Sequence, residues 1–294
     1  MTPGLYLQLL LLGAIWGTSF LFMRVLSPNI GAWFTAEVRI LLGGLGLVAW
    51  FAATGFDAQW RRFWKPYLVT GLINTALPFA LFSYAALTIP ASYSAILNSV
   101  APLWGALFAA IWLNDPFTLR KFAGLLASSS GVALIARIGP VPMTAEVLMA
   151  IGAAIAATAL YGIASVYIKL SLAQAKPAAV AGCSQLLAGL LFVPVLFTVP
   201  PSASFSTGVV VNIAFIGLVC GSVAYLLYYR ILSQAGPMHA LSVTYLVPLF
   251  GMTWGALFLD ETITPGMLGG CLMVLGGLAL LSSTPRKAAA LKAT

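Results

Sequence analysis

Two prolines and the polar residues beside them are the clearest sign of a ligand site in this sequence. Pro102 and Pro248 each lie near the midpoint of a long apolar segment, and residues 98–105 match residues 244–251 at a constant offset of 146. A proline inside a helix frees the carbonyl four residues earlier and bends the helix. Two interrupted apolar segments in equivalent positions of two halves are typical of a transporter's binding site. We therefore expect Pro102 and Pro248 to act as hinges beside a small-molecule site.

Polar residues at helical spacing would line such a site. Ser94, Asn98 and Pro102 share one face of a helix, and Thr244 and Pro248 share another. Faces of small and polar residues either line a cavity or let helices pack closely. For Asn98 we favour the cavity.

Aromatic residues in the middle of apolar segments are further candidates. Trp16 and Tyr161 lie away from the membrane interfaces, where aromatic rings usually concentrate. They either line a pocket for an apolar or aromatic group or pack in the core. Asn74 also lies mid-segment, where its amide needs a partner from the substrate or from another helix. The expected substrate-binding residues are Trp16, Asn74, Tyr84, Ser94, Asn98, Trp104, Tyr161, Tyr225, Thr244 and Tyr245.

Three ionisable residues are candidates for proton transfer or gating. Glu37 and Arg39 lie in the outer third of the second apolar segment, and intramembrane charges are functional candidates by default. A structural ion pair at the outer rim is favoured over a substrate contact. His239, the single histidine, can titrate near physiological pH, although a solvated histidine at a helix end is more common. No acidic residue lies in the middle third of any segment, so we expect facilitated rather than proton-driven transport.

Composition places the whole chain in a membrane. It is 61% hydrophobic and 7% charged, whereas soluble domains carry about 25% charged residues. A span needs about 20 apolar residues, and lipid requires the backbone to be hydrogen-bonded internally, so the spans are helices. The sequence predicts an all-α membrane protein with ten spans, at 5–26, 33–54, 67–88, 91–113, 119–137, 145–172, 178–199, 208–233, 237–259 and 264–283.

The positive charge of the chain orients it rather than binding nucleic acid. If both termini are cytoplasmic, eleven of the fourteen basic residues lie in inner loops or at inner ends of segments, as the positive-inside rule requires. This distribution predicts a bacterial-type inner membrane protein. The three cysteines lie within apolar segments without a CxxC motif, and we expect neither a metal nor a cofactor.

The chain divides into two similar halves. Trp16-Gly17 matches Tyr161-Gly162, and Arg24 matches Lys169, at an offset of 145. Each half, 1–140 and 141–294, would hold five spans, and because five is odd the second half is inverted, followed by a short cytoplasmic tail. Inverted repeats allow alternating access around a midplane cavity.

Several stretches resemble a known family. They are Gly13 to Phe20 (GAIWGTSF), Arg39, and the unit Ala101-Pro102-Leu103 through Asp115 to Gly124 and Gly131, with a second copy from Val247-Pro248-Leu249 through Glu261 to Gly270 and Gly277. Together they resemble the EamA-type drug/metabolite transporter superfamily, and most of all its aromatic amino-acid exporters. The resemblance implies ten helices in two inverted repeats and the export of small metabolites. Asn114-Asp115-Pro116 departs from the family's usual Gly-Glu pair, and Ser184 occupies the position equivalent to Arg39, so we expect asymmetric gates.

Other classes fit less well. An intramembrane enzyme needs a nucleophile with a base, or a metal cluster, and a channel or receptor does not require two inverted halves. A nucleotide-sugar carrier should have several midplane cations. We expect an exporter of amino acids with large or aromatic side chains, facilitative and a monomer or weak dimer, whose partners are its substrate and the lipid bilayer. The alternative is a broad-specificity drug/metabolite exporter coupled to protons.

Overall fold

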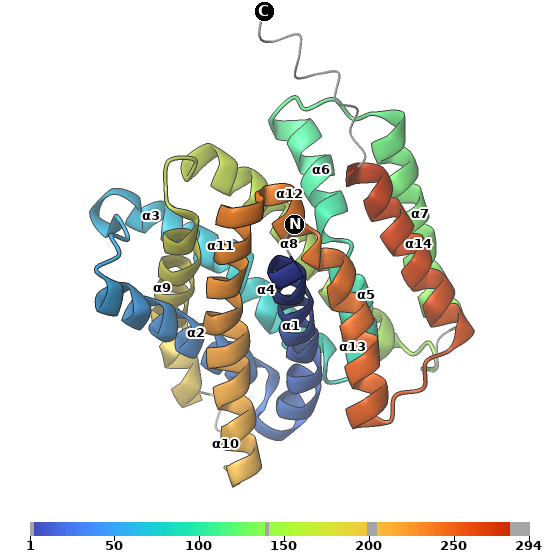
Figure 1. Ribbon diagram of the computed structural model, residues 1–294. Helices are drawn as coiled ribbons and strands as arrows, with labels where there is room; N and C mark the ends of the chain where they lie inside the picture. The colour runs from blue at the N-terminus through green and yellow to red at the C-terminus, as the bar shows by residue number, and fades with distance from the viewer. Residues whose placement is uncertain (1–2, 139–140, 199–204, 283–294) are drawn as a thin grey trace, which may run out of the picture.

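The computed structural model describes residues 3–138, 141–198 and 205–282, and every regular element in these ranges is helical (Figure 1). The expected cytoplasmic tail, after residue 283, lies outside the described residues. The α-helices are α1 (Pro3–Ile30), α2 (Ala32–Thr54), α3 (Trp60–Gly71), α4 (Leu77–Ala85), α5 (Ala91–Asn98), α6 (Ala101–Trp112), α7 (Leu119–Ile138), α8 (Ala145–Ser171), α9 (Pro177–Thr198), α10 (Thr207–Ala214), α11 (Ala224–Ala235), α12 (Pro237–Leu241), α13 (Val243–Leu259) and α14 (Pro265–Ser282). Two π-helical segments, η1 (Leu72–Ala76) and η2 (Phe215–Val223), join α3 to α4 and α10 to α11.

Most of these helices belong to stretches that can cross a membrane. Large apolar side chains such as Leu7, Phe197 and Leu272 are exposed on the outside of the bundle, where lipid tails would surround them. The chain is therefore an all-helical, multi-pass membrane protein. Within the described residues, eight stretches are long and apolar enough to span: Pro3–Ile30, Ala32–Thr54, Trp60–Ala85, Ala91–Trp112, Ala145–Ser171, Pro177–Pro194, Thr207–Ala235 and His239–Leu259.

The other two expected spans, 119–137 and 264–283, form α7 and α14. Helix α7 carries Arg120 and Lys121 in its first turn, and the apolar run of α14, Pro265–Leu280, is shorter than the eight spanning stretches. The two helices pack along one flank of the molecule (Figure 1). There the Ser128 hydroxyl donates to the Val274 carbonyl over 3.3 Å.

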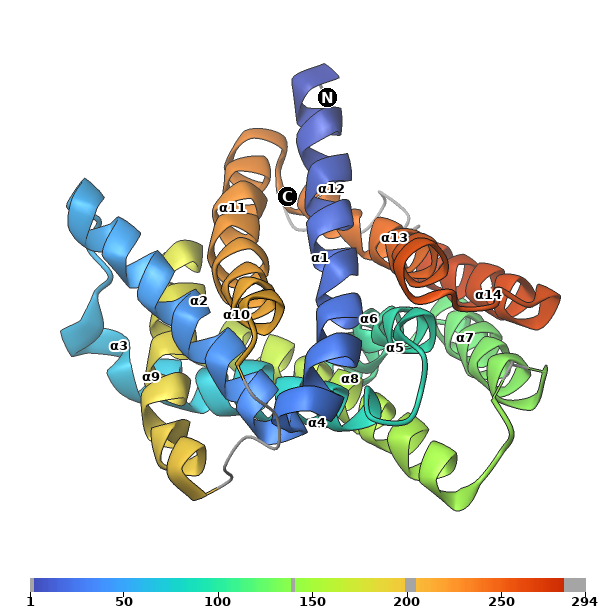
Figure 2. The same ribbon diagram turned by 90° about the horizontal axis from the view of Figure 1, so that it is seen from below.

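Helix α1 runs through the middle of the bundle, between α11 and α13 (Figure 2). Helices α2, α3 and α9 lie to one side of it, and α7 and α14 lie to the other. Helix α8 packs against α4, α5 and α6. Elements far apart in the sequence therefore meet around α1, which is where a central cavity can form.

The proline of the first half interrupts its span, as the sequence predicts. Helix α5 ends at Asn98, the amides of Ser99 and Val100 bond to carbonyls only three residues earlier, and α6 begins at Ala101 beside Pro102. In the second half the interruption lies instead at Ser242, between α12 and α13, and Pro248 lies inside continuous α13. The two halves thus differ at the positions of their matched prolines.

The π-helical segments are an unexpected feature that the halves share. Residues 72–76 of η1 correspond to residues 217–221 at an offset of 145, and these lie within η2. In the first half, a proline explains the π-helical hydrogen bonding of η1. Pro78 has no N–H to bond to the carbonyl of Asn74 four residues earlier. Such segments are frequent at functional sites, and η1 carries Asn74.

Candidate functional site

Two adjoining chambers open around the middle of α1. The wide chamber has a volume of about 530 Å³ and the deep chamber about 320 Å³. Four residues line both chambers, and they come from four different spans: Trp16, Asn74, Tyr225 and Thr244. The two chambers together form one cavity, called the central cavity below.

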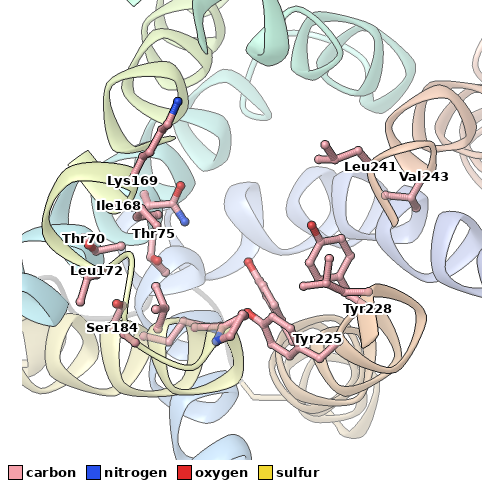
Figure 3. A pocket seen from close by; sticks show the side chains of 18 of the residues that line it. Thr70, Thr75, Ile168, Lys169, Leu172, Ser184, Tyr225, Tyr228, Leu241 and Val243 are labelled. Carbon is pink, nitrogen blue, oxygen red and sulfur yellow. The ribbon is translucent and has the colours of Figure 1, made fainter. Parts of the chain in front are cut away.

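The mouth of the central cavity lies at the wide chamber. Lys169 and Ala173, at the end of α8 and in the connection to α9, are exposed there, as is Leu241 at the end of α12. Figure 3 shows Tyr225 and Tyr228 of α11 across the chamber from Ile168 and Lys169 of α8, with Leu241 and Val243 on a third side. A solute can therefore enter between the α8–α9 connection and the α12–α13 junction.

Aromatic rings form much of the cavity wall. The Trp16 ring lies edge-on to Tyr225 with centroids 5.5 Å apart, and its centroid is 5.6 Å from that of Tyr228. Deeper in the cavity, Tyr161 stacks on Phe82 at 6.4 Å. Such rings offer a rigid apolar surface, and their N–H and O–H groups retain hydrogen-bonding capacity.

Polar residues also line the cavity. In the wide chamber, Thr70 Oγ1, Ser184 Oγ and Gln185 Oε1 are buried and lack a hydrogen-bond partner among the described residues. Asn98 and the guanidinium of Arg39 line the deep chamber. Buried polar atoms are usually satisfied, so this cluster can accept or donate hydrogen bonds to a bound molecule.

The deep end of the central cavity is closed. Phe20 and Met23, about one and two turns beyond Trp16 on α1, line it. Beyond them Arg24 Nη1 donates to the Ala86 carbonyl over 2.6 Å. At the start of α5, the carboxylate of Glu261 accepts from the amide of Ala91 at 2.6 Å and from the amide and hydroxyl of Ser92 at 3.0 and 2.6 Å.

Six of the ten expected substrate-binding residues line the central cavity: Trp16, Asn74, Asn98, Tyr161, Tyr225 and Thr244. The other four do not. Tyr84 is 42% exposed and faces outward, Ser94 is buried, Trp104 packs against Gly162, and Tyr245 lies on α13 outside both chambers. Pro102 lines the deep chamber, whereas Pro248 is buried outside the cavity.

The ion pair expected at the outer rim is absent among the described residues, where Glu37 pairs with neither Arg39 nor Arg24. Residues two apart on a helix do not face each other. Arg39 lines the deep chamber, with its guanidinium carbon 3.9 Å from the Phe79 ring centroid. Glu37 lies beside a separate small cavity with Trp33, and both of its carboxylate oxygens are buried without a partner among the described residues.

His239 lies outside both chambers. It is exposed on α12, with Nδ1 2.7 Å from the Ala235 carbonyl oxygen. A helix-end position of this kind is what the sequence suggests for it.

Several lining residues are absent from the sequence-based set. They include Thr70, Thr75, Lys169, Ser184, Gln185 and Tyr228. Two of them carried a usable signal, because Gln185 is a mid-span amide like Asn74, and Tyr228 follows Tyr225 at helical spacing.

A polytopic helical bundle with a cavity that opens at one end and is closed at the other has the architecture of a membrane transporter. Comparison with known proteins identifies which kind. Residues 4–137 and 148–283 each match the EamA-like transporter family, and the chain belongs to this family. It is therefore a transporter and not an enzyme, and its partners are a small-molecule substrate and the lipid bilayer.

Several relatives match nearly the whole chain. The chain is 25% identical to the uncharacterized transporter YvbV of Bacillus subtilis strain 168, over 97% of this chain and 94% of that protein. It is 22% identical to protein PecM of Dickeya dadantii, over 91% and 88%. It is 23% identical to a probable terminal-alkyne amino-acid exporter of Streptantibioticus cattleyicolor, over 89% and 88%.

One solved crystal structure shares the fold. Its TM-score is 0.66, at 18% sequence identity, over 96% of this chain and 97% of the other.

Proposed function

We propose that this protein exports amino acids with large or aromatic side chains from the cytoplasm by alternating access. The observation that carries the proposal is the central cavity, in which an aromatic wall of Trp16, Tyr161 and Tyr225 adjoins the amides of Asn74 and Asn98. An apolar wall with a few polar groups is what binds an amphipathic small molecule. The similarity to a probable amino-acid exporter, at 23% identity, supports the same substrate class.

The proposed alternating access rests on two inverted five-helix repeats, and matched close contacts support them. A Cβ at Gly17 of α1 would lie 2.7 Å from the Phe250 Cβ of α13. The equivalent Gly162 of α8 makes the same approach to Trp104 of α6, where a Cβ would lie 2.6 Å from its Cβ. Each repeat thus packs its first helix against the fourth span of the other repeat.

The ten-helix arrangement also needs α7 and α14 as the fifth spans of the two repeats. Ser128 of α7 bonds to Val274 of α14, and these residues are equivalents at the offset of 146. A contact between equivalents lies on the axis that relates the two repeats. This geometry favours ten spans, with repeats at 1–140 and 141–294.

The distribution of basic residues gives the orientation. The mouth of the central cavity lies at Lys169, near Lys176 and Arg62, whose side chains bond to Asp57 and Gln174 in the neighbouring connections. With both termini cytoplasmic, as the positive-inside rule indicates, the cavity opens to the cytoplasm of a bacterial-type inner membrane. This is the conformation in which an exporter loads its substrate.

Proton coupling with a broad substrate range is the second candidate, and Glu37 is the observation that favours it. Glu37 is 2% exposed, and both of its carboxylate oxygens are unpartnered among the described residues. An intramembrane carboxylate without a cation beside it is a plausible proton carrier. Because Glu37 lies outside the central cavity, its protonation would have to act through the movement of α2.

Counterflow in liposomes tests the proposal. Purified protein is reconstituted with unlabelled phenylalanine inside, and uptake of labelled phenylalanine, tryptophan or leucine is measured with and without a pH gradient. Saturable exchange that ignores the gradient is the expected result. Exchange that follows the gradient and is lost in Glu37→Gln favours the coupled exporter, and no exchange of any amino acid rejects the proposed substrate class.

A further inference from the structure

Arg39 is a buried cation that lines the deep chamber. The residue is 6% exposed, its Nη1 lies 3.8 Å from the Met23 sulfur, and its Nε is buried without a hydrogen-bond partner among the described residues. The Phe79 ring covers one face of the guanidinium at 3.9 Å. An aromatic face fixes the plane of a guanidinium and leaves its donor edge available to a ligand.

No carboxylate compensates this charge in the described part of the chain. The ion pairs there join Lys121 to Asp115 and Lys176 to Asp57, outside the cavity. Among the residues that the structure describes, neither chamber is lined by Asp or Glu, whereas Lys169 adds a second cation at the mouth. An arginine does not lose its proton in a protein, and a buried charge without a partner is strongly unfavourable. The deep chamber is therefore suited to an anion.

We propose that Arg39 binds the carboxylate of the transported substrate, which defines the substrate class as carboxylates bearing an apolar or aromatic group. This inference rests on the proposed function, in that the central cavity is the transport site. A guanidinium can hold a carboxylate through two parallel N–H···O bonds, which fixes orientation as well as position. The substrate enters the deep chamber with its carboxylate leading.

The rest of the cavity suits the remaining groups of an amino acid. An α-ammonium group beside the carboxylate faces the side-chain oxygens of Asn74 and Asn98, which line the deep chamber. The hydrophobic side chain then contacts Trp16 and Tyr225, which line both chambers. Because the ammonium group has only neutral acceptors and aromatic faces, its contribution is smaller than that of the carboxylate. An amine without a carboxylate meets only like charge.

Three ligands that share a phenylethyl scaffold test this assignment. L-phenylalanine carries both charged groups, 3-phenylpropionate only the carboxylate, and 2-phenylethylamine only the ammonium. Binding to purified protein is measured by calorimetry, and competition is measured in the counterflow assay. The variants are Arg39→Gln, Arg39→Lys and the control Arg61→Gln, which removes the same charge from an exposed position.

We expect the wild type and Arg61→Gln to bind phenylalanine and 3-phenylpropionate and to bind 2-phenylethylamine weakly. Arg39→Gln should weaken binding of both carboxylates roughly 10- to 100-fold, as loss of one partner of a buried charge pair does, and should abolish the preference for carboxylate over amine. Arg39→Lys should keep the preference at reduced affinity, because it keeps the charge but not the fork. Unchanged binding of 3-phenylpropionate in Arg39→Gln overturns the assignment.

Two further outcomes separate the inference from the proposed function. If the wild type exchanges no amino acid, the proposed function fails, and 3-phenylpropionate binding then decides the role of Arg39 by itself. Loss of that binding in Arg39→Gln supports the anion site, and absence of that binding in the wild type rejects it. If Arg39→Gln does not fold, Arg39→Lys tests the anion site instead. Weaker binding of 3-phenylpropionate with unchanged binding of 2-phenylethylamine supports the site. Unchanged binding of 3-phenylpropionate rejects it.

Discussion

The Trp16 ring is the largest apolar surface shared by the two chambers, and its contacts with Tyr225 and Tyr228 hold it in place. Trp16→Ala should raise the KM for phenylalanine roughly tenfold, because a buried aromatic contact of this kind dominates binding. Tyr84→Ala is the matched control, since Tyr84 is 42% exposed on the outside of the bundle. Counterflow kinetics measure both, and equal effects of the two substitutions would place the substrate's side chain elsewhere.

Asn98 ends α5 and lines the deep chamber. Replacing it with Ala should lower the ratio of kcat/KM between phenylalanine and isoleucine several-fold, because an amide that hydrogen-bonds the substrate constrains its position. Ser94→Ala, one turn earlier on the same helix and outside the cavity, should leave the ratio unchanged. Exchange assays with the two substrates give the answer. Unaltered affinity and selectivity in Asn98→Ala would assign Asn98 to helix packing.

Position along a segment predicts depth in the membrane but not the face of the helix. Asn74, Asn98 and Tyr161 reach the cavity as the sequence suggests, whereas Trp104, at comparable depth, packs against Gly162. The expected pairing of Glu37 with Arg39 is wrong for the same reason, since sequence proximity was used where helical geometry separates the two side chains. Which residues bind substrate stays a prediction.

The break between α5 and α6 is local to Pro102, whereas α13 continues through Pro248. A helix bends most easily where its hydrogen bonds are already missing. We therefore expect Pro102→Ala to reduce kcat several-fold and Pro248→Ala to reduce it less. Turnover at saturating substrate is the readout, with the amount of protein in the membrane measured in parallel. An equal loss in both variants would indicate that the prolines serve folding, and no loss in either would remove them from the mechanism.

The length of the apolar segments predicted the helices well, because in lipid the backbone must form its hydrogen bonds internally. The third span begins at Trp60 rather than at the expected residue 67, because the amphipathic turn before Tyr67 continues the helix. The π-helical segments and the break at Ser242 were not predicted. Each changes a hydrogen-bond register within an apolar run, and η2 has no proline to mark the change.

The closed end of the molecule depends on a contact between residues 170 positions apart, Ala91 and Glu261. A carboxylate at a helix N-terminus satisfies free amides and interacts favourably with the helix dipole. Glu261→Gln should weaken this closure by roughly 1 kcal/mol and shift the population toward the conformation in which this end is open and the mouth is closed. Asp260→Asn, at an exposed neighbouring position, is the control.

A cysteine at Ala173, exposed at the mouth of the cavity, reports this shift. The native cysteines Cys183, Cys220 and Cys271 are buried, so labelling of the new thiol in inside-out vesicles follows the open mouth. Glu261→Gln should slow that labelling several-fold. Faster or unchanged labelling would contradict a closing role for the Glu261 carboxylate.

The proposed inverted repeats predict that substitutions at the equivalent residue, Asp115, have the opposite effect on labelling. In the present conformation Asp115 pairs with Lys121 at 3.1 Å, and the mouth beside α12 is open. Residue 91, where Glu261 now binds, corresponds to residue 237 at the start of α12. Closing the mouth should therefore bring the Asp115 carboxylate to the first turn of α12. There the Met238 amide corresponds to the Ser92 amide that Glu261 binds, whereas Pro237 has no amide to donate. Asp115→Asn removes the cap from the mouth-closed state and should speed labelling of the Ala173 cysteine. Lys121→Gln frees the Asp115 carboxylate from its ion pair and should slow the labelling of this cysteine. If both substitutions act in the same direction, the two ends of the molecule are not closed by equivalent contacts, and the alternation requires a different gate at the mouth of the cavity.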